Sequence, residues 1–171
     1  RGKSVLNNSL GSNINTGIAS AFALGVGIFG KPKYDTALLE IDERSAPLIF
    51  PNIKPDVLLI NNLTRDSIMR NGHPEYIGRI LTEEMQEKTK LILNGDDLIA
   101  SSIAPSNERK YFGIESLDTD VEECKNLVND LRICPKCSSI LKYKHLRYHH
   151  IGKAYCENCG FESPKCDYEG K

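Results

Sequence analysis

The chain has 171 residues, of which 40% are hydrophobic and 26% are charged, and these values are ordinary for a soluble globular protein. They exclude a disordered or fibrous chain, and the length allows one domain with a core plus a small appendage. The 22 basic and 23 acidic residues give a net charge of −1, so no overall positive field attracts nucleic acid or an acidic membrane.

The amino-terminal stretch predicts a buried helix and no transmembrane segment. No charged residue occurs from Ser4 to Gly30, but the apolar part, about residues 17–30, is shorter than the ~20 residues that a bilayer needs. A secretory leader would have a charged start, an apolar centre and a small-residue cleavage site in that order, and this start lacks the order. We therefore expect a cytoplasmic protein.

Residues 1–129 predict an α/β body, because short apolar runs alternate with helical patterns, as in a mainly parallel sheet with flanking helices. We predict strands at residues 4–6, 36–41, 57–60, 90–93 and 110–114, and helices at about 13–29 and 75–88. Residues 36–41 and 57–60 read as buried strands and residues 110–114 as an edge strand. Polar residues 11–13 are expected to cap the first helix, and residues 118–129 to form a linker or short helix.

Gly2-Lys3-Ser4 matches only the last three positions of the phosphate-binding loop G-x-x-x-x-G-K-[ST]. The upstream glycine and its strand are absent, and the residues that follow would make a poor first helix. We interpret Gly2-Lys3 as a turn before a strand.

Residues 130–171 predict a zinc-ribbon insert. Two C-x2-C pairs, Cys134 with Cys137 and Cys156 with Cys159, are separated by 18 residues, a spacing typical of zinc ribbons. Four thiolates complete the tetrahedron of a zinc ion and leave no position for an activated water, so the predicted metal site is structural. Reduced thiols or two disulfides are the plainer alternative.

The ribbon also carries basic and aromatic residues that leave open a role in binding single-stranded nucleic acid. These are Lys142, Tyr143, Lys144, Arg147, Tyr148, Lys153 and Tyr155. Because the net charge gives such binding no support, we expect no nucleic acid partner. The histidines at 145, 149 and 150 are interpreted as surface or packing residues, and Cys124 and Cys166 receive no role.

Short motifs recur in a definite order along the chain. They are residues 4–19, Leu39-Glu40-Ile41-Asp42-Glu43, residues 55–66, Leu93-Asn94-Gly95-Asp96-Asp97, Phe112-Gly113-Ile114 and residues 152–161 at the end of the ribbon. Together they resemble the central domain of Mur ligases, a P-loop NTPase-like fold, and specifically the MurT-type subunit that amidates lipid II. A four-cysteine insert at this place separates the MurT type from other Mur ligases.

The resemblance implies an ATP-dependent ligase that activates the α-carboxyl of D-glutamate in the lipid II stem peptide as an acyl phosphate. Ammonia from a partner glutaminase of the class I glutamine amidotransferase (GatD) type would then form the amide. By position, Glu40 would bind a magnesium ion that bridges the ATP phosphates, Asn13 would lie near the nucleotide, and Asp66 would act through magnesium or substrate. The plainer alternatives are an exposed strand-end acid for Glu40 and a helix cap for Asn13.

Some positions depart from the family pattern. Asn61 and Met69 stand where the family has threonine and aspartate, and the metal-proximal histidine of other Mur ligases falls at Ser67. The resemblance also implies that a phosphate loop precedes Arg1 and that further strands and a domain follow Lys171. Because ATP turnover depends on cradling the phosphates, we predict that these 171 residues alone neither bind ATP tightly nor turn it over.

A rival interpretation is a binding module, in which an α/β scaffold presents the zinc ribbon to nucleic acid or protein and Glu40 is incidental. In a third interpretation the ribbon docks a protein, for example the glutaminase, or only rigidifies the chain.

Overall fold

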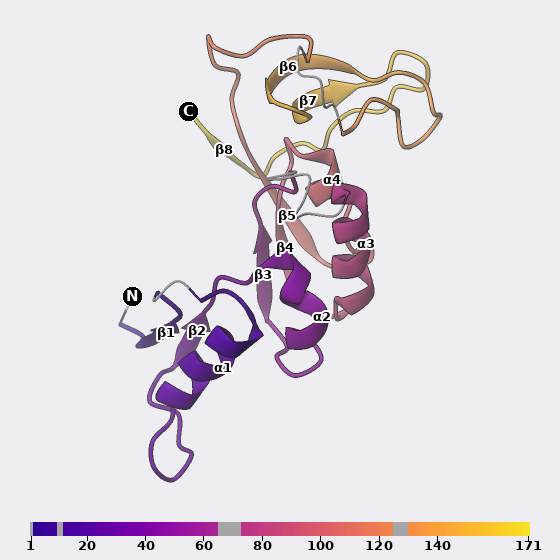
Figure 1. The fold of residues 1–171 in the computed structure, drawn as a ribbon. Coiled ribbons are helices and arrows are strands. Elements are labelled where there is room, and N and C mark those ends of the chain that lie inside the picture. Colours follow the sequence, from indigo (N-terminus) through magenta and orange to yellow (C-terminus); the bar gives the residue numbers. More distant parts are fainter. Residues whose placement is uncertain (1, 10–11, 65–72, 125–129) are drawn as a thin grey trace. The chain divides into compact units, whose positions relative to one another are not determined.

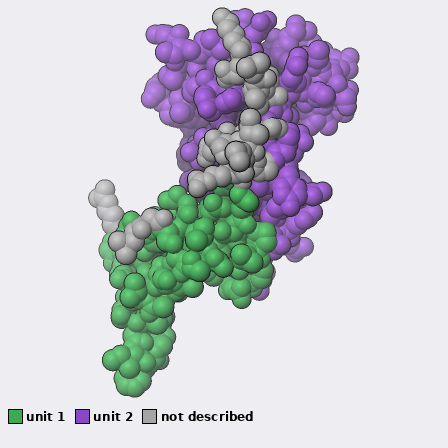
Figure 2. Space-filling model, viewed as in Figure 1, with its two compact units in different colours: residues 1–53 green, residues 54–171 purple. Residues whose placement is uncertain are grey.

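The computed structural model describes residues 2–9, 12–64, 73–124 and 130–171 (Figure 1). The chain forms two compact units, residues 1–53 and residues 54–171 (Figure 2). Each unit has its own parallel strands, and the second unit also contains the cysteine-rich segment. The division into residues 1–129 and 130–171 that the sequence suggests stays a prediction.

The first unit combines a pair of strands with one longer helix. Its elements are β1 (Val5–Asn7), α1 (Asn15–Leu24), β2 (Thr36–Leu38), the 3-10 helix η1 (Glu43–Ser45) and α2 (Ala46–Ile49). The two strands are parallel, with Leu6 opposite Ala37. Gly25 allows the end of α1 to approach β1 closely, because a Cβ at Gly25 would lie 3.0 Å from a methyl group of Leu6.

The strand at 36–41 is shorter and more exposed than predicted. β2 ends at Leu38, and all its residues are exposed. The prediction of a buried strand fails because β2 belongs to a sheet of two strands, which covers little of its surface.

The first helix also differs from the prediction at both ends. Its N-cap is Ile14, whose side chain cannot accept a hydrogen bond, so the predicted cap by Ser12 or Asn13 is wrong; Gly11 lies outside the described residues. The helix ends at Leu24 and not near residue 29, because a hairpin follows in which Val26 pairs with Pro32.

The second unit is built on a four-stranded sheet with the strand order β3-β4-β5-β8. Its elements are β3 (Val57–Ile60), α3 (Pro74–Glu84), β4 (Lys90–Asn94), α4 (Leu98–Ser101), β5 (Arg109–Ile114) and β8 (Tyr168–Gly170). All three pairings are parallel, which confirms the predicted mainly parallel α/β architecture. The core of this sheet is β4, where Leu91 and Leu93 are almost fully buried.

Two strand predictions for this sheet are wrong in detail. The strand at 110–114 was expected at an edge, but β5 lies between β4 and β8, because the chain returns to the sheet after the cysteine-rich segment. The strand at 57–60 was expected to be buried, but Val57 and Leu59 are 52% and 59% exposed. Val57 and Leu59 lie on the same face of β3, and this face stays largely uncovered.

The cysteine-rich segment forms an antiparallel hairpin of β6 (Lys142–Tyr148) and β7 (Ile151–Tyr155). Gly152 is required there, because a Cβ would lie 2.1 Å from the carbonyl oxygen of His145. The hairpin packs against α4 in one cluster of buried side chains: Leu98, Cys134, Leu141, Tyr143, Leu146, Ala154 and Cys156. The ribbon and α4 therefore share a core.

Among the described residues, every helix is too short or too polar to cross a membrane.

Candidate functional site

The four cysteines of the two C-x2-C pairs lie together. Their sulfur atoms are all within 4.8 Å of one another, with 3.6 Å between Cys134 and Cys159 and 3.5 Å between Cys137 and Cys156. A tetrahedral zinc ion with bonds of about 2.3 Å places its sulfur ligands about 3.8 Å apart. The cluster therefore has dimensions that suit a metal ion. All six cysteines are free thiols, so the disulfide alternative is not seen.

Two similar turns bring the sulfur atoms together. In the first, Ser138 donates its N–H to the carbonyl of Cys134, and in the second Gly160 donates to the carbonyl of Cys156, both at 3.0 Å. Ser138 and Gly160 have positive φ angles of 60° and 69°. The residue with the left-handed backbone stands at the same place in each turn. Each turn reverses the direction of the chain and leaves both thiols of a pair on one side.

Two thiols of the cluster, those of Cys137 and Cys159, differ in how readily they ionise. Hydrogen bonds from Ser139 and Asn158 lower the pKa of Cys137 to about 5. For Cys159 the N–H of Phe161 favours the thiolate, but burial and the neighbouring sulfur atoms raise its pKa to about 12. A divalent metal would remove this conflict by compensating the negative charges.

The predicted nucleotide-side residues lie at the carboxyl ends of β1 and β2. Glu40 follows β2 by two residues and is exposed. The side chain of Asn8 accepts from the N–H of Glu40 at 3.0 Å and donates to its carbonyl at 2.8 Å, so it continues the ladder between the strands. Asp42 donates its N–H to the carbonyl of Asn13 at 2.8 Å. These bonds bring the segments of Glu40 and Asn13 together.

Sequence reasoning did not single out Asn8, although an asparagine directly after a strand is a signal for such a bridge. Asp66, with Ser67 and Met69, lies outside the described residues, so the structure does not place it beside Glu40.

A buried acidic pair follows β4; sequence reasoning counted it among the motifs of the family resemblance and gave it no role of its own. Asp96 and Asp97 are 1% and 0% exposed. Asp96 accepts the N–H of Ile114 at 3.0 Å and lies 2.8 Å from the ammonium group of Lys153 on β7. Burial alone would lower the pKa of Lys153, but Asp96 and Cys166 raise it above its usual value. The signal in the sequence was two acids directly after a buried strand.

Asp97 joins three parts of the second unit. Its Oδ1 accepts the N–H groups of Ile99 and Ala100 at the start of α4, at 2.9 and 3.1 Å. Its Oδ2 accepts the N–H of Leu63, in the loop after β3, at 2.8 Å. The third partner is Nε2 of His150 in the ribbon, 3.1 Å from Oδ1. His150 is fully buried.

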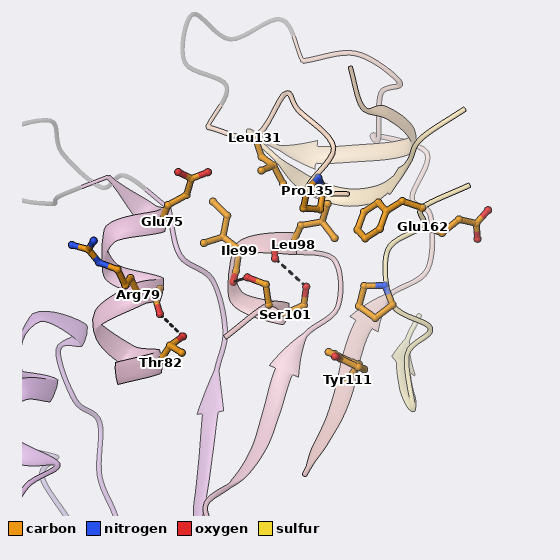
Figure 3. A pocket seen from close by; sticks show the side chains of 14 residues that line it. Glu75, Arg79, Thr82, Leu98, Ile99, Ser101, Tyr111, Leu131, Pro135 and Glu162 are labelled. Atoms are coloured by element: carbon orange, nitrogen blue, oxygen red, sulfur yellow. Dashed lines mark hydrogen bonds between the residues drawn. The ribbon is translucent and has the colours of Figure 1, made fainter. Parts of the chain in front are cut away.

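A groove of about 460 Å³ lies between α3, α4 and the ribbon (Figure 3). Leu98, Ile99, Leu131 and Pro135 give it an apolar floor, and Glu75 and Arg79 stand at its rim. Of the described residues predicted for metal or nucleotide, none lines this groove.

No family model matches the chain. Among curated proteins it is similar to "Lipid II isoglutaminyl synthase (glutamine-hydrolyzing) subunit MurT" of Staphylococcus aureus, with 30% identity over 167 residues, which are 96% of this chain and 37% of that subunit. The subunit of the same name from Streptococcus pneumoniae is 32% identical over 166 residues, 96% of this chain and 36% of its own length.

A solved structure, a pseudomurein peptide ligase type C from Methanothermus fervidus, is also similar, with a TM-score of 0.64 and 26% identity over 99% of this chain and 33% of that one. The resemblance to MurT-type Mur ligases is thus confirmed over nearly the whole chain. The chain spans about a third of the length of these relatives.

Proposed function

We propose that this chain, a homologue of MurT-type Mur ligases over 96% of its length, is part of an ATP-dependent ligase that amidates the D-glutamate α-carboxyl of lipid II. The reaction would pass through an acyl phosphate and use ammonia from a partner glutaminase of the GatD type. The observation that carries the proposal is that the similarity includes both the sheet and the cysteine-rich segment. Both curated relatives are named as subunits of a glutamine-hydrolysing synthase, which supports a role in peptidoglycan synthesis.

Zinc is proposed as the resident metal, held by Cys134, Cys137, Cys156 and Cys159. The sulfur distances suit it, and a set of four thiolates prefers zinc to magnesium or calcium. Because four protein ligands fill a tetrahedron, the metal would maintain the ribbon and take no part in bond formation.

Glu40 is proposed to bind magnesium, and Asn13 to lie near the nucleotide. Open α/β sheets bind ligands beyond the carboxyl ends of their strands, and Glu40 occupies that place after β2. Its exposed carboxylate offers the hard oxygen ligand that magnesium prefers. Asp66 is proposed as a further contact to magnesium or substrate. We also infer a cytoplasmic location, where ATP is available.

The rival role in nucleic acid binding is disfavoured by the ribbon's own ion pairs. The four basic residues considered for such binding each face a carboxylate at short range: Lys142 with Glu157 at 2.8 Å, Lys144 with Glu162 at 3.1 Å, Arg147 with Asp120 at 2.9 Å and Lys153 with Asp96 at 2.8 Å. Tyr143, one of the candidate stacking residues, is buried. The charges of these four basic residues are thus already balanced by nearby carboxylates, which weakens their use as phosphate contacts.

The test is reconstitution of the longer protein that contains this chain with a class I glutaminase, lipid II, ATP, magnesium and glutamine. Mass spectrometry should show conversion of the stem-peptide D-glutamate to the amide. Glu40→Gln should reduce the rate at least about 100-fold, since a lost metal ligand removes charge stabilisation of the phosphates. Glu87→Gln, an exposed acid of the second unit, is the matched control and should keep the wild-type rate. An unamidated product with wild-type protein would refute the proposal.

A further inference from the structure

The inference concerns His150, a fully buried ribbon residue that the proposed chemistry does not use. It lies in the turn between β6 and β7, and its Nε2 is 3.1 Å from Oδ1 of Asp97. Its Nδ1 is buried without a hydrogen-bond partner among the described residues. Because both oxygens of the Asp97 carboxylate accept hydrogen bonds, we assign Nε2 as the donor, and within the described part of the chain this is the ring's one polar contact.

Asp97 also binds the loop that follows the neighbouring strand β3. Its Oδ2 accepts the N–H of Leu63, a residue 34 positions earlier in the chain and three beyond the end of β3. A second bond between the same strand ends joins the side chains of Asn94 and Asn62 at 2.7 Å. The loop after β3 is thus held by two side chains at the end of β4, Asn94 in its last position and Asp97 just beyond it.

The ribbon is attached to the same place by further buried contacts. Gly152 donates its N–H to the carbonyl of Asp96 at 2.7 Å, and Lys153 forms its ion pair with the Asp96 carboxylate. β7 then leads directly into Cys156 of the cysteine cluster. The hairpin that carries His150 is therefore anchored by the cluster at one end and by the acidic pair at the other.

We propose that His150 is a positioning residue, which fixes the Asp97 carboxylate and through it the backbone of Leu63, so that the ribbon orders the carboxyl edge of the main sheet. The relevance of this edge to catalysis rests on the proposed function, since Mur-type chemistry would take place beyond the ends of these strands. The ribbon would then be needed for the geometry of the reaction and not only for stability.

The test is amide hydrogen exchange on the full metal-loaded chain. In His150→Ala the Leu63 amide should exchange at least about fivefold faster than in the wild type, the order expected when a hydrogen bond of ordinary net strength is lost. The Leu93 amide, in the centre of β4, should keep its protection. His150→Gln should restore the Leu63 protection, because the side-chain amide of glutamine can donate at the place of Nε2. Lys144→Ala, a change at an exposed ribbon ion pair, is the matched control and should leave both amides unchanged.

Unchanged exchange at Leu63 in His150→Ala would overturn the proposal, and so would equal loss in the alanine and glutamine variants, because the ring would then act by packing alone. If the alanine variant loses protection throughout β4, the decision passes to the wild-type chain treated with a zinc chelator. In the chelator-treated chain, faster exchange at Leu63 with retained protection at Leu93 supports the proposal. Unchanged exchange at Leu63 refutes it, and so does loss of protection at Leu93.

In the longer ligase, His150→Ala should lower the kcat of amidation with little change in the KM for ATP, and His150→Gln should recover it. If the wild-type ligase does not amidate lipid II at all, the proposed function fails, while the exchange data still decide the role of His150.

Discussion

The ammonium group of Lys153 in the ribbon lies 2.8 Å from Oδ1 of Asp96, which follows β4, and the two side chains are only 17% and 2% exposed. The guanidinium group of Arg147 lies 3.7 Å from the other oxygen of Asp96. The ribbon thus joins the sheet through charges that water cannot screen well. Loss of either partner would leave a buried charge without its counter-charge.

Replacement of Lys153 by methionine should therefore destabilise the chain by about 3 kcal/mol, at the low end for a broken buried pair because Arg147 remains close. Chemical denaturation at pH 7 measures the difference. Lys144→Met is the control, because the side chains of Lys144 and Glu162 are 57% and 61% exposed and such pairs contribute about 0.5 kcal/mol or less. Equal effects of the two substitutions would contradict the assignment of a buried pair.

The same ion pair predicts a pH dependence at the alkaline side. The pKa of Lys153 is raised in the folded chain by Asp96 and Cys166, which more than offset burial. A raised lysine pKa stabilises the fold fully below the unfolded value of about 10.4 and loses that contribution as the pH rises through the folded value. The stability difference between wild type and Lys153→Met should stay constant from pH 7 to about 10 and shrink above it. Denaturation midpoints of both proteins across this pH range measure the difference. A stability difference that grows with pH would contradict a raised pKa of Lys153.

The cysteine cluster predicts one zinc ion per chain. Elemental analysis of the purified chain should find it, and Cys156→Ser should abolish it, because three thiolates and a hydroxyl no longer close the site. Cys124→Ser should keep the metal, since Cys124 packs against the ribbon core but is not among the clustered sulfur atoms. If Cys156→Ser retains zinc, or if the wild-type chain contains none, the proposed metal centre is wrong.

The ribbon and the parallel sheet could be predicted from the sequence because each has a local signature. The spacing of the two C-x2-C pairs predicts that four sulfur atoms come together, as they do, and Leu91 and Leu93 lie in an apolar run typical of a central strand. The contacts that join the two parts have no local signature. His150 and Asp97 are 53 residues apart, and neither residue type indicates which side chain it will contact in the fold.

Burial of the strands was predicted less well for a related reason. An apolar run shows that a strand can be covered, but coverage depends on neighbours that come from elsewhere. Leu38 and Leu59 are 71% and 59% exposed, because the faces of β2 and β3 on which they lie are left uncovered. β5 was misplaced at an edge because its neighbour β8 arrives only after the ribbon.

The chain by itself should bind ATP no more tightly than about millimolar. Tight phosphate binding needs the backbone cradle and lysine of a G-x-x-x-x-G-K-[ST] loop, and the sequence holds only its last three residues at Gly2-Lys3-Ser4. Titration with a fluorescent ATP analogue in the presence of magnesium measures the affinity. A micromolar dissociation constant would show that these residues carry a nucleotide site of their own.

Asn8 should hold the Glu40 segment in place. Its side-chain amide donates to the carbonyls of Ser12 and Glu40 and accepts the N–H of Glu40, at 2.8 to 3.0 Å. Asn8→Ala removes all three bonds and should cost about 1 to 2 kcal/mol of stability, a low value for three bonds because the two bonds to Glu40 are exposed to water. Asn52→Ala is the control, since the exposed Asn52 side chain makes one long bond, 3.3 Å to the carbonyl of Leu48, and its loss should cost less than about 0.5 kcal/mol. In the longer ligase, Asn8→Ala should also raise the magnesium concentration needed for half-maximal activity, as expected if Glu40 binds the ion. If Asn8→Ala lowers the stability but leaves the magnesium dependence unchanged, the result would contradict magnesium binding by Glu40. Glu40 would then be only an exposed acid at the end of a strand.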